Sequence, residues 1–480
     1  MILSIDQSTS ATKAFLFDES AKIINKVSIP HEQFYPKEGY VEHDAEEIYL
    51  NTLKAIIILS KEAINIKAIS ITNQRETIVL WDKISGTPIY NAIVWQDNRG
   101  SKICEDIEKL GYSHIIKEKT GLTLSPFFSA SKISWILKNV PIAKELLSKN
   151  RLLCGTMDSF LIYRLSHNKK HLTDFSNASR TQLFNIHTLE WDEEILDLFE
   201  IPKEILPEVK FSDEIFGYFN KIPITGVLGD SHAALFGQNC FNPGDIKATY
   251  GTGSSIMLNI GERPLLNKNG IVTSIGFGFR NKISYVFEGN INSTGATIKW
   301  LSENLEMMKI EEAESLASSV DSNLGVYLVP SFTGLGAPYW DNDAKAIITG
   351  LTFGANKKHI VRAGLESIAY QVKDCLDAMI SSLGFTLKEI RVDGEPCKNK
   401  FLMQFQSDIL NAIVSVNNTS ETSALGSAFI AGLAVGMWND LSDVENLTSV
   451  KTKYFPSMDE KKIYKLCTGW KEAIVKARGK

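Results

Sequence analysis

Cysteine and histidine are scarce in this chain, and neither forms a pairing or metal-binding pattern. The 480 residues include 6 cysteines with no CxxC spacing, and 8 histidines that form no HExxH or other metal-ligand spacing. Scattered cysteines argue against a disulfide framework, and the missing spacings give no motif for a metal site. We therefore expect reduced thiols and a cytoplasmic protein.

Long apolar runs and a charge excess of one sign are also missing. The longest aliphatic run, Ala55–Leu59, is far too short to span a bilayer. The opening residues, MILSIDQSTS, lack a basic segment and are interrupted by Asp6, which indicates a strand rather than a signal peptide. The net charge is −5, the sequence pI is about 6.0 and both signs are interspersed. We expect neither nucleic acid nor a membrane as a partner.

The length of the chain favours two domains, because a single core rarely grows beyond about 250–300 residues. The apolar periodicity fades between Pro207 and Pro223. We therefore predict an N-terminal domain over 1–222 and a C-terminal domain over 223–480.

Strands that alternate with helices predict an α/β architecture. Helical spacing covers residues 45–63, with Asp44 as the expected N-cap, and a second helix is expected at Ala233–Gln238. The expected strands are Met1–Ile5, Ala14–Phe17, Ile23–Ile29, Ala68–Ile71, Ile224–Leu228, Ile246–Tyr250 and Ile256–Asn259. The segments LSIDQSTSATKAFLF and IKATYGTGSSIMLNI share a strand–turn–strand pattern, which indicates a weak internal duplication.

Two turns rich in small polar residues are candidate phosphate sites. DQSTSATK (Asp6–Lys13) offers hydroxyls, N–H groups and the charge of Lys13 to an anion, while Asp6 could hold a hydrated Mg²⁺. YGTGSS (Tyr250–Ser255) is a similar turn after a later strand. Neither matches GxxxxGK[ST], and each alone is also typical of an ordinary solvated hairpin. Together, in corresponding places of two half-chains, they predict a grip on a nucleotide phosphate chain between two domains.

Charged residues follow two of the apolar strands. Arg75 and Glu76, in TNQRET, could orient the hydroxyls of a polyol, or form a surface ion pair of little energetic value. Asp230, in GVLGDSHAALFGQ, is either a helix N-cap or a catalytic base at a strand tip. Ser231 and His232 do not complete a hydrolase triad with it, because contiguous residues rarely face one another and the GxSxG elbow is absent.

The chain resembles the FGGY carbohydrate kinase family, and within it the glycerol kinases, from Ile2 to about Trp470. The likeness rests on long segments, among them YPKEGYVEHDAEEIY, ITNQRET, PIYNAIVWQDNR, TDFSNASRTQLFNIHTLEWD, FTGLGAPYWD and FLMQFQSDIL. FFSASKISWILKN fits the first signature pattern of the family, and AIITGLTFGANKKHIVRAGLESIAYQ approximates the second.

This resemblance implies a two-domain actin-like ATPase (ribonuclease H-like) fold, with a duplicated ββαβ-type core and an interdomain cleft. It implies transfer of the γ-phosphoryl group of ATP to a polyol hydroxyl, with Mg²⁺, in a homodimer or homotetramer. Glycerol is the first expected acceptor. The resemblance places the catalytic base at Asp230, the metal near Asp6, and the glycerol hydroxyls at Arg75 and Glu76, beside Trp95. The residues that it places around ATP are Thr9, Ser10, Lys13, Thr252, Gly253, Gly295, Lys299, Glu395 and Asn399.

The substrate pocket departs from the glycerol kinase pattern at three positions. Phe127, Ser231 and Ser255 stand where glycerol kinases usually carry tyrosine, glutamine and phenylalanine. Because the two serines remove volume, the alternative to glycerol is a longer polyol or ketose, such as a tetritol or a pentulose.

The nucleotide side departs as well. Lys13 replaces the usual arginine and Ala11 a serine, while Glu395 replaces a glycine and Lys299 a glutamine. Glu395 and Lys299 either weaken the binding of adenine or pair with each other. A third interpretation is a non-catalytic sensor, although the chain keeps Asp6, Arg75 and Asp230.

Overall fold

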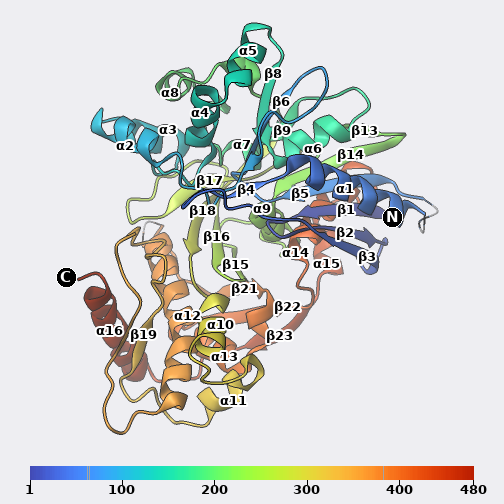
Figure 1. The fold of residues 1–480 in the computed structure, drawn as a ribbon. Coiled ribbons are helices and arrows are strands. Elements are labelled where there is room, and N and C mark those ends of the chain that lie inside the picture. Colours follow the sequence, from blue (N-terminus) through green and yellow to red (C-terminus); the bar gives the residue numbers. More distant parts are fainter. Residues whose placement is uncertain (62, 64, 382, 480) are drawn as a thin grey trace.

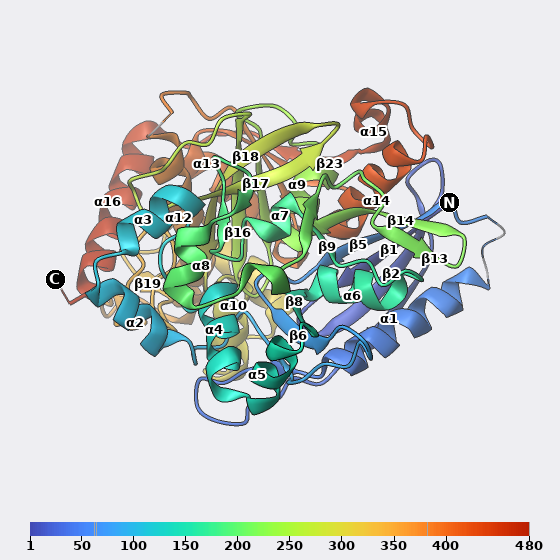
Figure 2. The same cartoon turned by 90° about the horizontal axis from the view of Figure 1, so that it is seen from above.

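The computed structural model describes residues 1–479 except 62, 64 and 382. The chain forms an N-terminal lobe and a C-terminal lobe, each built on its own sheet (Figure 1). Seen from above, the helix layers lie on both sides of these sheets (Figure 2). The predicted strands and helices of both half-chains are present within a few residues of their expected bounds.

The sheet of the N-terminal lobe has six strands. In spatial order they are β13 (Gly217–Phe219), β14 (Ile222–Gly229), β5 (Ala68–Asn73), β1 (Ile2–Gln7), β2 (Ala11–Phe17) and β3 (Ile23–Pro30). The three central strands β14, β5 and β1 run parallel, whereas β13, β2 and β3 pair antiparallel with their neighbours. The carboxyl ends of three parallel strands therefore meet at one edge of this sheet.

The sheet of the C-terminal lobe repeats this arrangement. In spatial order its strands are β17 (Val272–Phe279), β18 (Lys282–Ile291), β16 (Ser254–Gly261), β15 (Ile246–Tyr250), β21 (Glu389–Asp393), β22 (Ile413–Asn417) and β23 (Val450–Tyr454). Strands β15, β21 and β22 are parallel, and the flanking pairs are antiparallel. Read from β23 to β18, the order and the directions match those from β13 to β3, so the internal duplication is confirmed.

Smaller sheets and helices extend both lobes. A four-stranded sheet contains β4 (Glu42–His43), β7 (Ala92–Ile93), β6 (Ile78–Asp82) and β8 (Leu152–Thr156). The two-stranded sheets are β10 (Phe184–Asn185) with β11 (Glu190–Trp191), β12 (Glu208–Lys210) with β9 (Leu172–Asp174), and β19 (Tyr327–Val329) with β20 (Ile347–Thr349). The helices of the N-terminal half are α1 (Ala45–Ser60), α2 (Ser101–Lys109), α3 (Ser113–Thr120), α4 (Ser129–Asn139), α5 (Pro141–Ser148), α6 (Met157–Leu165), α7 (Phe175–Ala178), α8 (Glu193–Phe199) and the 3₁₀ turn η1 (Lys203–Ile205).

In the described part of the second half there are eight further α-helices. They are α9 (Asp230–Gly237), α10 (Gly295–Glu303), α11 (Ala313–Ser318), α12 (Lys357–Ile380), α13 (Lys400–Leu410), α14 (Thr422–Ala434), α15 (Leu441–Leu447) and α16 (Glu460–Ala477), with 3₁₀ turns η2 (Ile310–Glu312) and η3 (Glu395–Lys398). Among the described residues, no helix is both long and apolar enough to cross a membrane. The six cysteines are all free thiols.

Helix α1 shows how local chemistry sets an element. Asp44 caps it as expected, because its carboxylate accepts from the backbone N–H groups of Glu46 and Glu47 at 2.8 and 3.3 Å. The helix ends at Ser60, earlier than the predicted residue 63, because Lys61 bonds back to Ile58 in a tighter final turn. Residue 62 of the predicted range lies outside the described residues.

Two helices of the second half join the sheets. Helix α14 packs on β14, β5 and β1, and α9 packs against α14 and β15 (Figure 1). One apolar core passes through this layer and includes Leu228, Phe236, Met257 and Phe429. The lobes are thus anchored to each other directly behind the strand tips that carry the candidate site. The predicted boundary between 222 and 223 stays a prediction.

Candidate active site

Three candidate residues lie at the carboxyl ends of the parallel strands β1, β5 and β14. Asp6 is the penultimate residue of β1 and pairs in register with Thr72 of β5. Arg75 follows β5 by two residues, and Asp230 directly follows Gly229, the last residue of β14. Because parallel strands end at the same edge, side chains that are distant in sequence come together.

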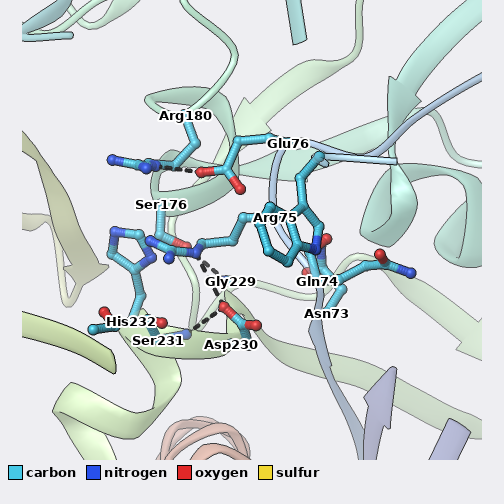
Figure 3. A network of polar contacts seen from close by, with 12 residues as sticks. Asn73, Gln74, Arg75, Glu76, Ser176, Arg180, Gly229, Asp230, Ser231 and His232 are labelled. Atoms are coloured by element: carbon cyan, nitrogen blue, oxygen red, sulfur yellow. Dashed lines mark hydrogen bonds and ion pairs between the residues drawn. The ribbon is translucent and has the colours of Figure 1, made fainter. Parts of the chain in front are cut away.

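Asp230 and Arg75 form the centre of this group. The Nε atom of Arg75 lies 3.0 Å from Oδ1 of Asp230, and its Nη1 lies 2.9 and 3.0 Å from the two carboxylate oxygens of Glu288 on β18 (Figure 3 shows the Arg75–Asp230 pair). Arg75 and Glu288 are buried, whereas 38% of the Asp230 side chain is exposed. The arginine therefore fixes a carboxylate that remains partly exposed.

A second arginine extends the network to Glu76. Arg180 donates from Nε to Oε1 of Glu76 at 2.6 Å, and its Nη1 lies 2.9 Å from Oε2 of Glu288. Burial alone would raise the pKa of Glu288, but Arg180 and Arg75 bring that pKa down to about 2. For Glu76, burial dominates and raises the pKa. The chain of ion pairs Asp230–Arg75–Glu288–Arg180–Glu76 is buried except at Asp230, and it crosses from one lobe to the other.

The residues on either side of Asp230 make this arrangement possible. Gly229, not Asp230, is the N-cap of α9, so the capping interpretation of Asp230 is wrong; its Oδ1 instead accepts from the N–H of Ser231 at 2.6 Å, within the first turn. A Cβ atom on Gly229 would lie 2.6 Å from Cγ of Arg75, so only glycine lets that side chain pass. Glycine also receives support from Ser176, whose hydroxyl accepts the Gly229 N–H at 3.0 Å.

His232 lies behind Arg75 and away from the cleft. It is fully buried, and its Nε2 lies 3.4 Å from the hydroxyl of Ser274. Burial holds the pKa of His232 well below its ordinary value, and the adjacent Arg75 acts in the same direction. A neutral histidine at this position fills space beside the arginine.

Aromatic residues form a wall beside Glu76. The rings of Trp95 and Phe127 meet edge to face, with their centroids 5.5 Å apart. The buried Lys132 holds the Phe127 segment by donating to the carbonyls of Pro126, Phe127 and Phe128 at 2.6, 2.6 and 3.1 Å. This wall is apolar and rigid, as expected for the carbon chain of a small polyol.

The two serines of the predicted pocket come from different lobes. Ser231 follows Asp230 on α9 and is half-buried. Ser255 lies on β16, and its hydroxyl accepts from the buried ammonium group of Lys247 at 3.4 Å. Lys247 was not recognisable as a site residue from the sequence.

The first candidate phosphate turn contacts both the aromatic wall and the opposite lobe. The hydroxyl of Thr9 accepts the indole N–H of Trp95 at 3.0 Å, and Ser10 is exposed next to it. Lys13 forms an ion pair of 3.7 Å with Glu421, which directly precedes α14. Burial raises the pKa of Asp6 to about 7; Lys13 opposes the rise and the carboxylates of Asp230 and Glu421 add to it.

The second candidate phosphate turn lies against the N-terminus of α10. The carbonyls of Gly251 and Thr252 accept from the N–H groups of Gly295 and Ala296 at 3.0 and 3.1 Å. A Cβ atom on Gly253 would lie 2.4 Å from the carbonyl of Ile291, so the turn packs tightly on β18. The structure thus brings Thr252, Gly253 and Gly295 together as predicted.

Residues 394–399 lie next to this turn, because Gly394 packs on the carbonyl of Tyr250. Gly394 has a φ of 103°, and a Cβ atom there would lie 1.9 Å from the carbonyl of Tyr250. Asn399 is the N-cap of α13, accepting from the N–H of Leu402 at 2.9 Å. Glu395 does not pair with Lys299: it pairs with Lys398 at 2.7 Å, and Lys299 with Glu303 at 3.7 Å. Both side chains find a partner on their own helical turn, so the predicted alternative of a Glu395–Lys299 pair is wrong.

Three comparisons with known proteins place the chain. Models of the N-terminal and C-terminal domains of the FGGY family of carbohydrate kinases match residues 1–237 and 246–435. Glycerol kinase 1 of Thermotoga maritima is 52% identical over 486 residues, which cover 99% of each chain. The chain belongs to the FGGY family of carbohydrate kinases. A glycerol kinase of Saccharolobus islandicus is 50% identical over 486 residues, 100% of this chain and 97% of the relative.

Solved structures agree with this family. The crystal structure of Plasmodium falciparum glycerol kinase with ADP matches with a TM-score of 0.95 and 38% identity, over 99% of this chain and 98% of the other. The expected two-domain α/β fold of the FGGY kinases is confirmed, and so is the class of ATP-dependent polyol or sugar kinase. The roles of individual residues stay predictions.

Proposed function

We propose that this FGGY kinase transfers the γ-phosphoryl group of ATP to a hydroxyl of glycerol, with Asp230 as the general base. Glycerol kinases are its relatives at 52% and 50% identity over almost the entire chain. The observation that carries the proposal is the meeting of Asp230, Arg75 and Glu76 in one buried ion network whose only half-open member is Asp230.

Asp230 takes the proton of the acceptor hydroxyl. As that oxygen bonds to the γ-phosphorus, the bond from the γ-phosphorus to the bridging oxygen breaks and ADP leaves. Such transfers depend mainly on positioning, and a well-placed base adds about 10²–10⁴-fold. Arg75, at 3.0 Å, keeps the carboxylate in place for this step.

The acceptor lies between charged and apolar groups. Arg75 donates to, and Glu76 accepts from, the hydroxyls that do not react, while Trp95 and Phe127 cover the carbon chain. Arg180 fixes the Glu76 carboxylate at 2.6 Å, so the acceptor meets a preorganised site.

The nucleotide lies across the cleft between the two phosphate turns. Thr9, Ser10 and Lys13 hold the phosphates from the N-terminal lobe, and Thr252 and Gly253 from the other. The residues proposed for the nucleoside end are Gly295, Lys299, Glu395 and Asn399. Lys299 and Glu395 are 64% and 78% exposed, so both can adjust to the base.

Mg²⁺ fits beside Asp6. The Asp6 carboxylate accepts no hydrogen bond from a described residue, and the carboxylates of Asp230 and Glu421 concentrate negative charge around it. Hard oxygen donors of this kind suit Mg²⁺, and Asp6 would hold it through water. When bound, the ion neutralises phosphate charge.

Steady-state kinetics test the proposal. Purified protein is assayed for ADP release with ATP, Mg²⁺ and glycerol, and Asp230→Asn is compared with Asp321→Asn, an exposed control. We expect Asp230→Asn to lose about 10²–10⁴-fold in kcat while calorimetry still detects nucleotide binding. The absence of ADP release with any polyol, or full activity in Asp230→Asn, would refute the proposal.

The alternatives make different predictions for the same assays. A sensor would bind nucleotide and polyol without turnover; the retention and assembly of Asp6, Arg75 and Asp230 favour the enzyme.

A cytoplasmic location and a homodimer or homotetramer are inferred from the sequence and the resemblance, and gel filtration with light scattering tests the assembly.

A further inference from the structure

A buried lysine on the C-terminal sheet has no part in the reaction described above. Lys247, on β15, is fully buried, and its Nζ donates to Thr249 Oγ1, Ser255 O and Ser255 Oγ at 3.3, 3.3 and 3.4 Å. All of its acceptors among the described residues are neutral oxygens. Burial lowers the pKa of Lys247 to about 8, against the pull of the nearby Asp393 carboxylate, so the group is mostly charged at neutral pH.

The strand register places Lys247 in a row of neighbouring residues next to a second, polar row on the same face of the sheet. Lys247 pairs with Met257 on β16, which pairs with Glu288 on β18. One step along, Thr249 pairs with Ser255, which pairs with Asn290. Side chains two residues apart on a strand share a face, so both rows face the same side of the sheet.

That side of the sheet faces the catalytic group. Glu288 is bound by Arg75, which also binds Asp230. Asn290 lies two residues beyond Glu288 on β18 and on the same face, a step of roughly 7 Å along the strand. Ser255 lies directly opposite Asn290, about 5 Å away between Cβ atoms. The Ser255–Asn290 pair therefore lies on the same face of the sheet as Glu288, one strand step from the carboxylate that Arg75 links to Asp230.

The hydroxyl proton of Ser255 has no hydrogen-bond acceptor among the described residues. An ammonium group only donates, so the Ser255 hydroxyl accepts from Lys247 and must direct its own proton elsewhere. No acceptor for that proton, and no partner for the amide group of Asn290, exists among the described residues. Both residues are half-buried rather than sealed in the core. Ser255 and Asn290 are thus a partly exposed polar pair with unused hydrogen-bonding groups.

We propose that Ser255 and Asn290, backed by Lys247, form a subsite for one more hydroxyl than glycerol carries, and that four-carbon polyols (tetritols) belong to the acceptor class of this kinase. The inference rests on the proposed kinase function. The extra ligand group is neutral, because Asp230, Glu288 and Asp393 already surround the ammonium group with carboxylates. Ser255 donates to the additional hydroxyl, and Asn290 donates or accepts beside it.

Acceptor kinetics provide the first test. The wild-type protein is assayed with glycerol, erythritol and threitol at saturating ATP and Mg²⁺, and kcat/KM is compared. We expect one tetritol to be phosphorylated with a kcat/KM within about tenfold of that for glycerol, since one carbon changes such ratios by roughly 10–200-fold in a site that does not fit it.

Variants of the pair provide the second test. Ser255→Ala and Asn290→Ala should each lower the ratio of kcat/KM for the tetritol to kcat/KM for glycerol about tenfold. Ser255→Phe fills the subsite and should abolish tetritol turnover while glycerol turnover remains. Lys247→Met should lower kcat/KM for the tetritol about as much as Ser255→Ala does. The double variant Lys247→Met/Ser255→Ala should lower it no further than either single variant, because the two residues act as a unit. Lys282→Met, an exposed change on β18, is the control.

The outcomes separate the inference from the function on which it rests. Glycerol turnover without tetritol turnover would overturn the inference and leave the kinase proposal standing. Equal losses with both acceptors in Ser255→Ala would also overturn it, because that result indicates a structural role. No turnover with any polyol would overturn the kinase proposal itself. If Lys247→Met fails to fold, the Ser255 and Asn290 variants still test whether the pair forms the subsite.

Discussion

Trp95 donates its indole N–H to the hydroxyl of Thr9 at 3.0 Å, and this bond joins the two halves of the candidate site. The ring of Trp95 belongs to the proposed polyol wall, whereas Thr9 lies in the turn proposed to hold the phosphates of ATP. The backbone N–H of Trp95 also donates to the hydroxyl of Thr77, next to Glu76, at 3.2 Å. The proposed polyol wall and the proposed phosphate turn are therefore joined by a direct hydrogen bond.

Removal of this bond should weaken the use of ATP. We expect Trp95→Phe and Thr9→Val each to lower kcat/KM for ATP about fivefold, because a neutral hydrogen bond contributes about 1 kcal/mol. The double variant should lose little more than either single one, which steady-state kinetics in a double-mutant cycle will show. Additive losses would mean that the two residues act independently. Tyr464→Phe, on the exposed surface of α16, should change nothing.

Arg180 should be essential for stability as well as for activity. Arg180→Met leaves the buried carboxylates of Glu76 and Glu288 without one of their partners, which costs about 3–5 kcal/mol of the free energy of unfolding. Urea titration should show a lower midpoint, and kcat/KM for glycerol should fall because Glu76 is no longer held. Lys138→Met breaks an exposed pair with Glu200 and should cost at most about 1 kcal/mol. Equal effects of the two changes would contradict the assigned role.

The polar residues at strand tips could be predicted from the sequence. Asp6, Arg75 and Asp230 each stand at or just beyond the end of a short apolar run, and parallel strands bring such ends together. The two duplicated hairpins could also be predicted, because each turn is recognised from its own glycine, serine and threonine residues.

The partners of these residues could not be predicted. Glu288 and Lys247 lie inside strands of the opposite sheet, and only the packing of the two lobes and the strand register bring them to Arg75 and Ser255. The proposed Glu395–Lys299 pair failed for the converse reason, since each side chain meets an opposite charge within one helical turn of its own chain.

Gly229 should be required for the geometry around Asp230. Its φ of −64° suits any residue, but a Cβ atom would lie 2.6 and 2.7 Å from Cγ and Cδ of Arg75. Gly229→Ala should therefore displace Arg75 from Asp230 and lower kcat for glycerol about 100-fold, the loss expected for a misplaced catalytic group. Overpacking should cost about 1–3 kcal/mol of stability. Gly354→Ala, where the new atom meets the end of Leu324 at 3.3 Å and the hydroxyl of Thr352 at 3.9 Å, is the matched control and should keep full activity. Unchanged kinetics in Gly229→Ala would show that Arg75 does not position Asp230.

His171 should make the protein less stable in acid. It is half-buried between the rings of Trp81 and Tyr163, and this burial lowers its pKa from 6.5 to about 4, although the bond with the Cys154 carbonyl at 2.9 Å raises it. Between pH 6.5 and pH 4 the unfolded chain binds the proton more tightly than the folded protein does. The contribution of His171 is therefore complete above pH 6.5 and declines as the pH falls, by roughly 2 kcal/mol between pH 6.5 and pH 5.

Urea unfolding at a series of pH values measures this contribution. His171→Phe keeps a ring between Trp81 and Tyr163 but cannot bind a proton, so the fall in unfolding free energy from pH 6.5 to pH 5 should be smaller by about 2 kcal/mol than in the wild type. His114→Phe, at an exposed position, should leave that fall unchanged. Identical pH dependence in the wild type and His171→Phe would show that the buried imidazole is not the group that loses stability in acid. A residual slope is expected in His171→Phe, because His43 is also buried, with a pKa lowered to about 3, and resists protonation in the same way.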